Sequence, residues 1–206
     1  HPKIALASSF GVEDTVLIDM LCKITSKPRI FTLDTGRLHQ ETYNVMDAVR
    51  EKYDIDIEVY FPKADQVEKM AREYGLNLFY KSPELRRLCC NIRKVEPLSR
   101  ALSELDAWIT GLRREQCLTR AEIKKVEIDK GNEGIVKINP LADWSSAQVW
   151  TYVRKNKVPY NELHDQGYPS IGCAPCTRPV SPGEDLRAGR WWWESQNVKE
   201  CGLHCK

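Results

Sequence analysis

The sequence predicts an α/β fold: a doubly wound, mostly parallel sheet with helices on both faces and an irregular C-terminal tail. Short apolar runs alternate with amphipathic segments of helical spacing through the first 75 residues. Strands and helices that alternate at this rhythm are typical of a parallel sheet covered by crossover helices. From Pro159 onward Pro and Gly become frequent and the periodic pattern is lost, which predicts the irregular tail.

Each predicted element rests on its own pattern. The run "KIALASSF" at 3–10 is apolar and ends in small residues, as a buried strand does. Helix 64–75 ends at Gly75, a good C-cap, and helix 145–157 begins at Ser145, a good N-cap. Two strand-like runs flank "KGNEG" at 130–134 and predict a hairpin. Further strands are expected at 29–36, 56–62 and 107–113, and further helices at 13–24 and 40–53.

Pro97 interrupts the helical pattern between 83 and 105. A proline inside a helix removes a backbone hydrogen bond and clashes with the carbonyl four residues earlier. We therefore expect one helix from about Pro83 to Val95 and a second one that starts near Pro97.

Composition bounds the class of protein and its partners. The 206 residues are enough for one sizeable core, and 42% hydrophobic with 29% charged residues is typical of a globular protein. A net charge of +2 and the lack of a long apolar run indicate neither a nucleic-acid nor a membrane partner. No secretory signal is visible, so we expect a cytoplasmic protein, with more chain upstream because residue 1 is His1 and not Met.

The chain holds eight cysteines, a high count for its length. Without a secretory signal, thiolates that serve metal or redox chemistry are expected in place of disulfides. Cys89 and Cys90 are adjacent, and their Cα atoms, about 3.8 Å apart, are closer than an ordinary disulfide allows. "CAPC" at 173–176 is a C-x-x-C pair, which occurs in redox, zinc and iron–sulfur sites.

Taken together, the two pairs favour a [4Fe–4S] cluster. Structural zinc usually takes two C-x₂₋₄-C pairs, and adjacent cysteines do not fit that spacing. The iron atoms of a cluster are spread enough for adjacent thiolates to reach different corners. Spacing alone leaves zinc and four unrelated core cysteines open as alternatives. The four candidate ligands are Cys89, Cys90, Cys173 and Cys176.

Two further patterns bear on an anionic ligand. "SSFGVEDT" at 8–15 stands between the first strand and the first helix, where backbone N–H groups and hydroxyls can meet an anion. By itself this motif favours an ordinary turn, because it matches neither GxGxxG nor a Walker A loop. Singly, each basic residue near the cysteines is an ordinary surface charge, but together they suggest an anionic substrate. They are Arg93, Lys94, Arg113, Arg114, Arg120, Arg178, Arg187 and Arg190.

The chain ends in "KECGLHCK", which places Cys201 and Cys205 within six residues of the end. Chain termini are usually exposed, so a buried structural role for a cysteine there is unexpected. Taken in order, six motifs now resemble the adenylyl-sulfate reductase branch of the assimilatory APS/PAPS reductase family. They are "SSFGVED", "LDTG" at 33–36, "CCNIRKVEPL" at 89–98, "GLRREQ" at 111–116, "GCAPCTRP" at 172–179 and "ECGLH" at 200–204.

The resemblance implies a fold like that of the adenine nucleotide α-hydrolases and the reduction of adenosine 5′-phosphosulfate (APS) to sulfite and AMP. It implies that Cys201 is the nucleophile and forms an S-sulfonate, which a thioredoxin-type thiol then cleaves. It also implies a reductase domain over 1–182 and a mobile catalytic tail over 183–206, and it leaves room for a homo-oligomer. Cys205, which follows "ECGLH", departs from the pattern; we interpret it as a bystander and not as a thiol that resolves Cys201.

The same resemblance implies roles for individual residues. The cluster ligands would be the four cysteines named above. Cations for catalysis would be Lys94, Arg120, Arg187 and Arg190, acting with Cys201. Substrate would be held by Ser8, Ser9, Gly11, Leu33, Thr35, Gly36, Gly111, Arg113 and His204.

Three rival functions remain open at the level of sequence. A PAPS reductase with the same cluster is the nearest, although Glu13 and Asp14 place negative charge where a 3′-phosphate would be unwelcome. An ATP-dependent thiolation enzyme is disfavoured by Phe10 and Gly11, which replace the S-G-G-x-D-S loop of ATP-cleaving relatives. A zinc-binding module without catalysis is the third.

Overall fold

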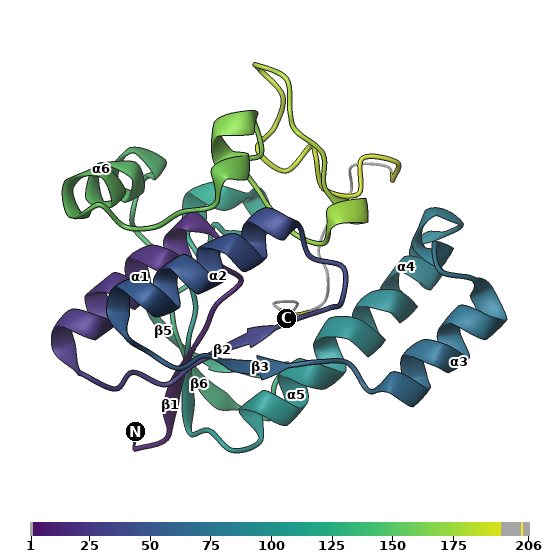
Figure 1. Cartoon of the computed structure of the whole chain (residues 1–206), viewed down its shortest axis with the longest axis horizontal. Coiled ribbons are helices and arrows are strands. Elements are labelled where there is room, and N and C mark those ends of the chain that lie inside the picture. Colours follow the sequence, from purple (N-terminus) through teal and green to yellow (C-terminus); the bar gives the residue numbers. More distant parts are fainter. Residues whose placement is uncertain (1, 195–202, 204–206) are drawn as a thin grey trace.

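The computed structural model describes residues 2–194 and 203 of the chain. Within these residues six strands form one sheet in the order β3-β2-β1-β4-β6-β5 (Figure 1). Every neighbouring pair is parallel except β5 and β6, which are antiparallel. The predicted mostly parallel sheet is therefore confirmed. The strands are β1 Ile4–Ala7, β2 Ile30–Leu33, β3 Glu58–Tyr60, β4 Ala107–Ile109, β5 Val126–Asp129 and β6 Ile135–Ile138.

Helices and short helical turns connect these strands. The α-helices are α1 Val12–Ile24, α2 Gln40–Tyr53, α3 Ala64–Tyr74, α4 Pro83–Cys90, α5 Glu96–Leu102 and α6 Ser146–Asn156. A π-helical turn, η2 Asn91–Val95, joins α4 to α5. The 3₁₀ turns are η1 Leu78–Tyr80, η3 Arg114–Gln116, η4 Leu118–Arg120, η5 Glu162–Gln166 and η6 Ala174–Cys176.

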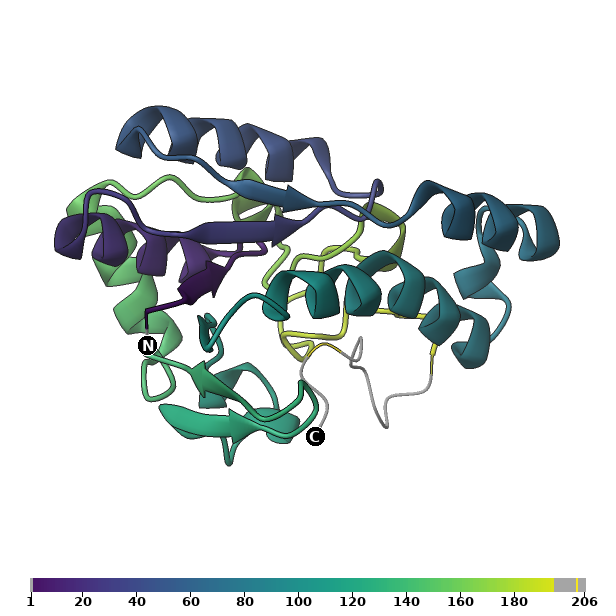
Figure 2. The same cartoon turned by 90° about the horizontal axis from the view of Figure 1, so that it is seen from below.

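The helices cover both faces of the sheet. α1, α2 and α6 share a buried cluster with Leu6 and Ile109 on one face. α5 packs on the other face, where Leu98 meets Phe31 and Trp108. Figure 2 shows the run from α5 to α4 on the opposite side of the sheet from α2. Burial on both faces explains why the strands read as short apolar runs in the sequence.

The sheet changes its winding direction at β1. β2 pairs with one side of β1, and β4 pairs with the other side, where Ile4 lies opposite Ala107 and Leu6 opposite Ile109. In open parallel sheets, ligands bind beyond the carboxyl ends of the strands at such a reversal. The loops that follow β1, β2 and β4 are therefore the expected walls of a binding site.

The helix break expected at Pro97 is wrong. α4, η2 and α5 continue without interruption from Pro83 to Leu102, and Figure 1 shows them as one ribbon. In η2 the backbone N–H of Glu96 donates to the carbonyl of Asn91, five residues earlier. Pro97 then stands in the first turn of α5, where a missing N–H costs little. The wider π-turn lets the helix pass the proline.

Other local predictions fare better. The hairpin is confirmed, with β5 and β6 paired around 130–134. The strand expected at 56–62 is shorter, because only its three residues Glu58–Tyr60 pair with β2 at the edge of the sheet. After α6 the described chain is irregular apart from η5 and η6, as expected, yet Trp191 there is buried against Met70 and Phe79. The predicted division into 1–182 and 183–206 stays a prediction.

The N-terminus of α6 gives a direct test of local structure. Gln148 N–H donates to the Ser145 hydroxyl at 3.2 Å, and Ser145 N–H donates to the Gln148 side chain at 2.7 Å. Ser145→Ala should therefore lower the free energy of unfolding by about 1 kcal/mol, measured by urea titration. Ser146→Ala, which removes the neighbouring exposed hydroxyl, should change it by less than about 0.5 kcal/mol. Equal losses in the two variants would contradict the cap.

Candidate functional site

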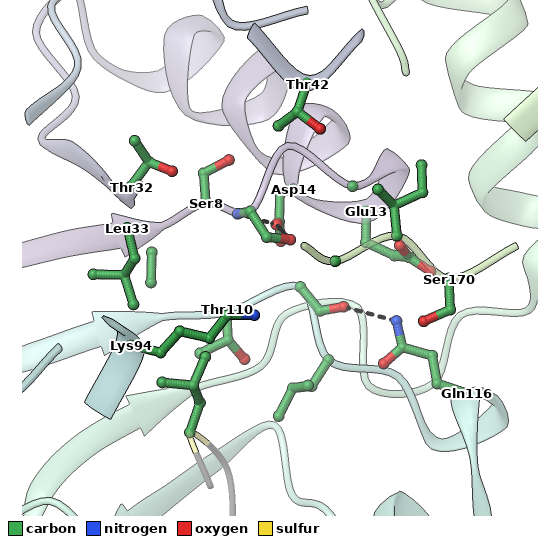
Figure 3. A pocket seen from close by; sticks show the side chains of 18 of the residues that line it. Ser8, Glu13, Asp14, Thr32, Leu33, Thr42, Lys94, Thr110, Gln116 and Ser170 are labelled. Atoms are coloured by element: carbon green, nitrogen blue, oxygen red, sulfur yellow. Dashed lines mark hydrogen bonds between the residues drawn. The ribbon is translucent and has the colours of Figure 1, made fainter. Parts of the chain in front are cut away.

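The main pocket opens where the sheet reverses. Its walls include Ser8 after β1, Leu33 at the end of β2, and Thr110 and Gly111 after β4. In Figure 3, Ser8 and Asp14 lie on one side of the pocket, and Lys94 and Gln116 lie on the other. The loop at 8–15, which is predicted to bind the nucleotide, thus lines a cavity. The topology of the sheet favours a ligand site at this position.

The loop between β1 and α1 is held by one carboxylate. Ser9 donates to Asp14 Oδ2 twice, from its backbone N–H at 2.6 Å and its hydroxyl at 2.8 Å. Phe10 takes a left-handed backbone with φ of 56° and donates its N–H to the Ser8 hydroxyl at 3.1 Å. Gly111 packs against Asp14 so closely that a Cβ there would lie 2.2 Å from Asp14 Oδ1. The loop and the end of β4 are therefore fixed together.

Burial is the dominant influence on Asp14. It raises the pKa of that carboxyl to about 6, although the hydrogen bonds from Ser9 act in the opposite direction. The nearby Glu13 also raises the pKa of Asp14. Near neutral pH Asp14 is mostly ionised and accepts from Ser9, but a modest fall in pH neutralises it.

Arg113 lines the same pocket but its guanidinium is engaged within the protein. It is buried, and it donates from Nε to Glu13 Oε1 at 2.9 Å and from Nη1 to the carbonyl of Trp144 at 3.1 Å. This pairing uses much of the charge of Glu13. Arg113 can still face a ligand, but its first role is to fix Glu13 beside the nucleotide loop.

The four cations predicted to serve catalysis all line the main pocket. They come from three separate parts of the chain: Lys94 from η2, Arg120 from η4, and Arg187 and Arg190 from the irregular segment. Arg120 donates to Gln116 Oε1 at 2.6 Å, so a neutral side chain orients it. These four cations together form a cationic wall of the cavity.

The "LDTG" motif forms the wall of the main pocket that follows β2. Gly36 has a φ of 68° and donates its N–H to Asp34 Oδ1 at 2.7 Å, so it makes the turn after β2. Leu33 and Thr35 line the main pocket, but Gly36 is not among its lining residues. The Thr35 hydroxyl lies 3.3 Å from Cys173 Sγ, which connects this wall to the cysteines.

The four candidate cluster ligands come together. Cys89, Cys90, Cys173 and Cys176 all line a second, smaller cavity next to the main pocket. Lys94 lines both cavities. The other charged residues around the second cavity are all cations: Arg37, Arg86 and Arg93.

The chemistry of this second cavity fits an anionic iron–sulfur cluster. Burial raises the pKa of Cys89 and raises that of Cys176 to about 12, so these thiols need cationic or metal partners to ionise. Burial acts the same way on Cys173, but Lys94, Thr35 and Arg190 outweigh it and lower its pKa. In the described part of the chain, no three Cys, His, Asp or Glu side chains are grouped as a site for a single metal ion.

Two of the predicted residues, Cys201 and His204, lie outside the described residues, as does Cys205. Leu203, which stands between the first two, is described and lines the main pocket beside Lys94 and Leu98.

Sequence reasoning missed His164. It lines the main pocket, and its Nδ1 lies 2.8 Å from the carbonyl of Tyr168, which fixes the orientation of the ring. Burial lowers the pKa of His164, so a neutral imidazole faces this region. Its position in η5 is far along the chain from Ser8, and no local pattern marks it; only the fold brings the two together.

A family model described as "Phosphoadenosine phosphosulfate reductase domain" matches residues 3–179. The chain belongs to this family. An adenosine 5′-phosphosulfate reductase of Burkholderia cepacia is 55% identical over 99% of this chain and 81% of its own length. Its counterpart from Allochromatium vinosum is 54% identical over 98% of this chain and 78% of its own length.

Solved structures agree with this family assignment. A phosphoadenylyl-sulfate (PAPS) reductase from Candida auris, in a phosphate complex, is 34% identical with a TM-score of 0.74, over 86% of this chain and 84% of that one. A Candida glabrata FMN adenylyltransferase, in complex with FAD and inorganic pyrophosphate, has a TM-score of 0.60 at 15% identity, over 95% of this chain and 66% of its own, and shows the shared fold alone. The adenine nucleotide α-hydrolase-like fold expected from the sequence is thus confirmed. In the described part of the chain, no helix combines the length and apolar character that crossing a bilayer requires.

Asp14 predicts a distinctive pH dependence. The pKa of Asp14 is about 6 in the folded chain, higher than the ordinary value of 3.8. Between these two pH values the folded chain therefore binds more protons than the unfolded chain, and the free energy of unfolding falls as pH rises. A shift of about two units corresponds to about 3 kcal/mol. Asp14→Asn should reduce the fall in unfolding free energy between about pH 3 and about pH 7 by that amount, measured by guanidinium titration at each pH.

Asp47→Asn provides the matched control for this test, since Asp47 is exposed on α2. It should follow the wild-type pH profile. An Asp14→Asn profile parallel to wild type would show that Asp14 titrates at an ordinary pKa.

Proposed function

We propose that this protein reduces adenosine 5′-phosphosulfate to sulfite and AMP with electrons from a thiol. The observation that carries the proposal is the convergence of Lys94, Arg120, Arg187 and Arg190 on the pocket that the nucleotide loop also lines. The relatives of highest identity quoted above are named for the same reaction.

The nucleoside is assigned to the side of the pocket formed by the strand ends. Ser8, Ser9 and Gly11 present hydroxyls and backbone groups at the start of α1, and Leu33, Thr35 and Gly111 line the adjoining walls. Gly36 contributes by turning the chain after β2. Asp14 adds negative charge on this side, while the charge of Glu13 is offset by Arg113, and the charge of Asp14 suits a free 3′-hydroxyl better than the 3′-phosphate of PAPS.

The phosphosulfate is assigned to the cationic wall. A thiolate that approaches a phosphosulfate brings like charges together, and each such pair about 4 Å apart costs about 4 kcal/mol at an effective dielectric of 20. Lys94, Arg120, Arg187 and Arg190 offset this repulsion and stabilise the phosphate of the departing AMP.

The chemistry takes three displacements. The thiolate of Cys201 attacks the sulfur of APS, the bond from that sulfur to the bridging oxygen breaks, and AMP leaves with the electron pair. A dithiol protein of the thioredoxin type then attacks Cys201 Sγ and expels sulfite as a mixed disulfide forms. Its second thiol releases Cys201, so the donor becomes a disulfide and the two electrons balance. His204 would contribute to docking of the substrate.

The cysteine cavity is assigned to a [4Fe–4S] cluster held by Cys89, Cys90, Cys173 and Cys176. Such a cluster would supply a fixed negative charge next to Lys94, while the thiols supply both electrons of the reaction. Lys94 lines both cavities, so the cluster would orient its amine toward substrate. Thiol chemistry of this kind suits a reducing compartment, which supports the expected cytoplasmic location.

The nucleophile is tested by a single turnover. Incubation with APS and no thiol donor should add one sulfonate to Cys201 and release one AMP per chain, measured by peptide mass spectrometry and chromatography. Cys201→Ser should form no adduct but still bind APS, because the nucleotide side of the pocket is unchanged. Cys205→Ser should keep the adduct. A sulfonate on Cys205, or turnover by Cys201→Ser, would overturn the assignment.

The cluster is tested by composition and colour. Anaerobically purified protein should contain about four iron atoms per chain and have the brown colour of an iron–sulfur protein. Cys89→Ser should lose both signals, while Cys22→Ser, on α1 and remote from the second cavity, should keep them. Stoichiometric zinc without iron would contradict the cluster.

A further inference from the structure

Trp191 occupies an unusual position in the irregular segment. Its side chain is only 1% exposed, and its backbone is left-handed with a φ of 43°. A bulky residue adopts this conformation only where the surroundings impose it, and such sites cluster at functional positions. The backbone N–H of Trp191 donates to the carbonyl of Cys176 at 3.2 Å, and its own carbonyl accepts from Glu194 at 2.9 Å.

Two guanidinium groups stack on the Trp191 ring. Arg86 Cζ lies 4.6 Å from the ring centroid and Arg190 Cζ lies 4.7 Å from it. Arg86 belongs to the wall of the cysteine cavity, and Arg190 belongs to the wall of the main pocket. The indole therefore makes direct contact with one cation of each cavity.

Arg86 is immobilised by a buried ion pair. Its Nε and Nη2 donate to the two carboxylate oxygens of Glu194, each at 2.9 Å. The side chains are only 2% and 8% exposed. A buried pair of this kind adds little net stability, because desolvation offsets the attraction, but it specifies one geometry strongly. Arg86 is thus a fixed surface against which the Trp191 ring is placed.

Arg190 has neutral partners in the main pocket. It is 6% exposed, and its Nη1 lies 3.3 Å from the Ser170 hydroxyl and 3.4 Å from the carbonyl of Ile171. It lies on Gly172, where a Cβ would come within 2.4 Å of Nη2. Among the described residues no carboxylate pairs with Arg190, and its Nε has no hydrogen-bond partner. Its charge lowers the pKa of Cys173 and is not otherwise taken up by a carboxylate of the described chain.

We propose that Trp191 is a positioning residue: clamped by Arg86 and Glu194, it holds the Arg190 guanidinium over Gly172 for the anionic group of the nucleotide. This proposal rests on the proposed function. Stacking fixes the plane of the guanidinium, so the group reaches the ligand with little freedom left to lose. Without the ring, Arg190 has only two long hydrogen bonds to hold it.

The test compares a charged with an uncharged ligand. AMP carries the phosphate and adenosine lacks it, so only AMP binding depends on Arg190. Trp191→Leu should weaken AMP binding by about 10-fold or more, as expected when a charge-assisted contact is lost, with adenosine binding within about 2-fold of wild type. Trp191→Phe keeps an aromatic face and should restore AMP binding to within about 3-fold. Isothermal calorimetry measures both ligands.

Two further variants keep the result interpretable. Gly172→Ala should displace Arg190 without changing Trp191, and should reproduce the selective loss of AMP binding. Trp192→Leu changes the next tryptophan, which is 39% exposed and makes edge-to-face contacts with Tyr80 and Trp193, and should leave both affinities unchanged. Equal loss of AMP and adenosine binding in Trp191→Leu would show that Trp191 is merely structural. Unchanged binding of both ligands would show that Arg190 does not depend on Trp191. Either result overturns the proposal.

The proposed function and this inference fail in different ways. A wild-type protein that binds AMP but does not reduce APS would contradict the proposed function. The selective effect of Trp191→Leu on AMP binding could still be measured in that case. A wild-type protein that binds AMP no more tightly than adenosine would refute the role of Arg190 as an anion contact, and the inference with it.

Discussion

Both cavities depend on the π-turn between Asn91 and Val95. The helical run around it carries Arg86, Cys89 and Cys90 before the turn and Leu98 after it, and the turn itself carries Lys94. A π-turn contains one more residue than an α-turn of the same rise, so it rotates everything that follows around the helix axis. As a result, the cysteines line one cavity, Lys94 lines both cavities, and Leu98 packs on the sheet.

Local sequence rules predicted the parts of this fold that depend on neighbouring residues. The Ser145 cap and the hairpin at 130–134 need only a few adjacent side chains, and both were predicted correctly. Pro97 was misread because the rule against proline inside a helix assumes α-helical hydrogen bonding, and the π-turn changes that bonding. His164 was missed because nothing near it in the sequence indicates that it lines a pocket together with Ser8, about 150 residues earlier in the chain.

Charge is divided between the two sides of the main pocket. Carboxylates lie on the side of the nucleotide loop, where Asp14 accepts from Ser9 and Glu13 pairs with Arg113. Lys94 lies across the pocket from this loop, and further cations line both cavities. Because Glu13 is paired with Arg113, it neutralises little of the cationic wall. The pocket can thus distinguish the uncharged from the charged end of one ligand, which is a matter of orientation as much as of affinity.

The pairing of β1 with β4 has a consequence for how the chain is made. Ile4 lies opposite Ala107 and Leu6 opposite Ile109, so the first strand finds its second neighbour about 100 residues later. Contacts between residues so distant in sequence form slowly, because the intervening loop must close first. During synthesis, β1 can pair with β2 early but keeps an open edge until β4 has left the ribosome. β1, one of the two central strands of the finished sheet, is therefore the strand that waits longest for both of its partners. A nascent chain stalled before residue 107 presents the open edge of β1 to chaperones.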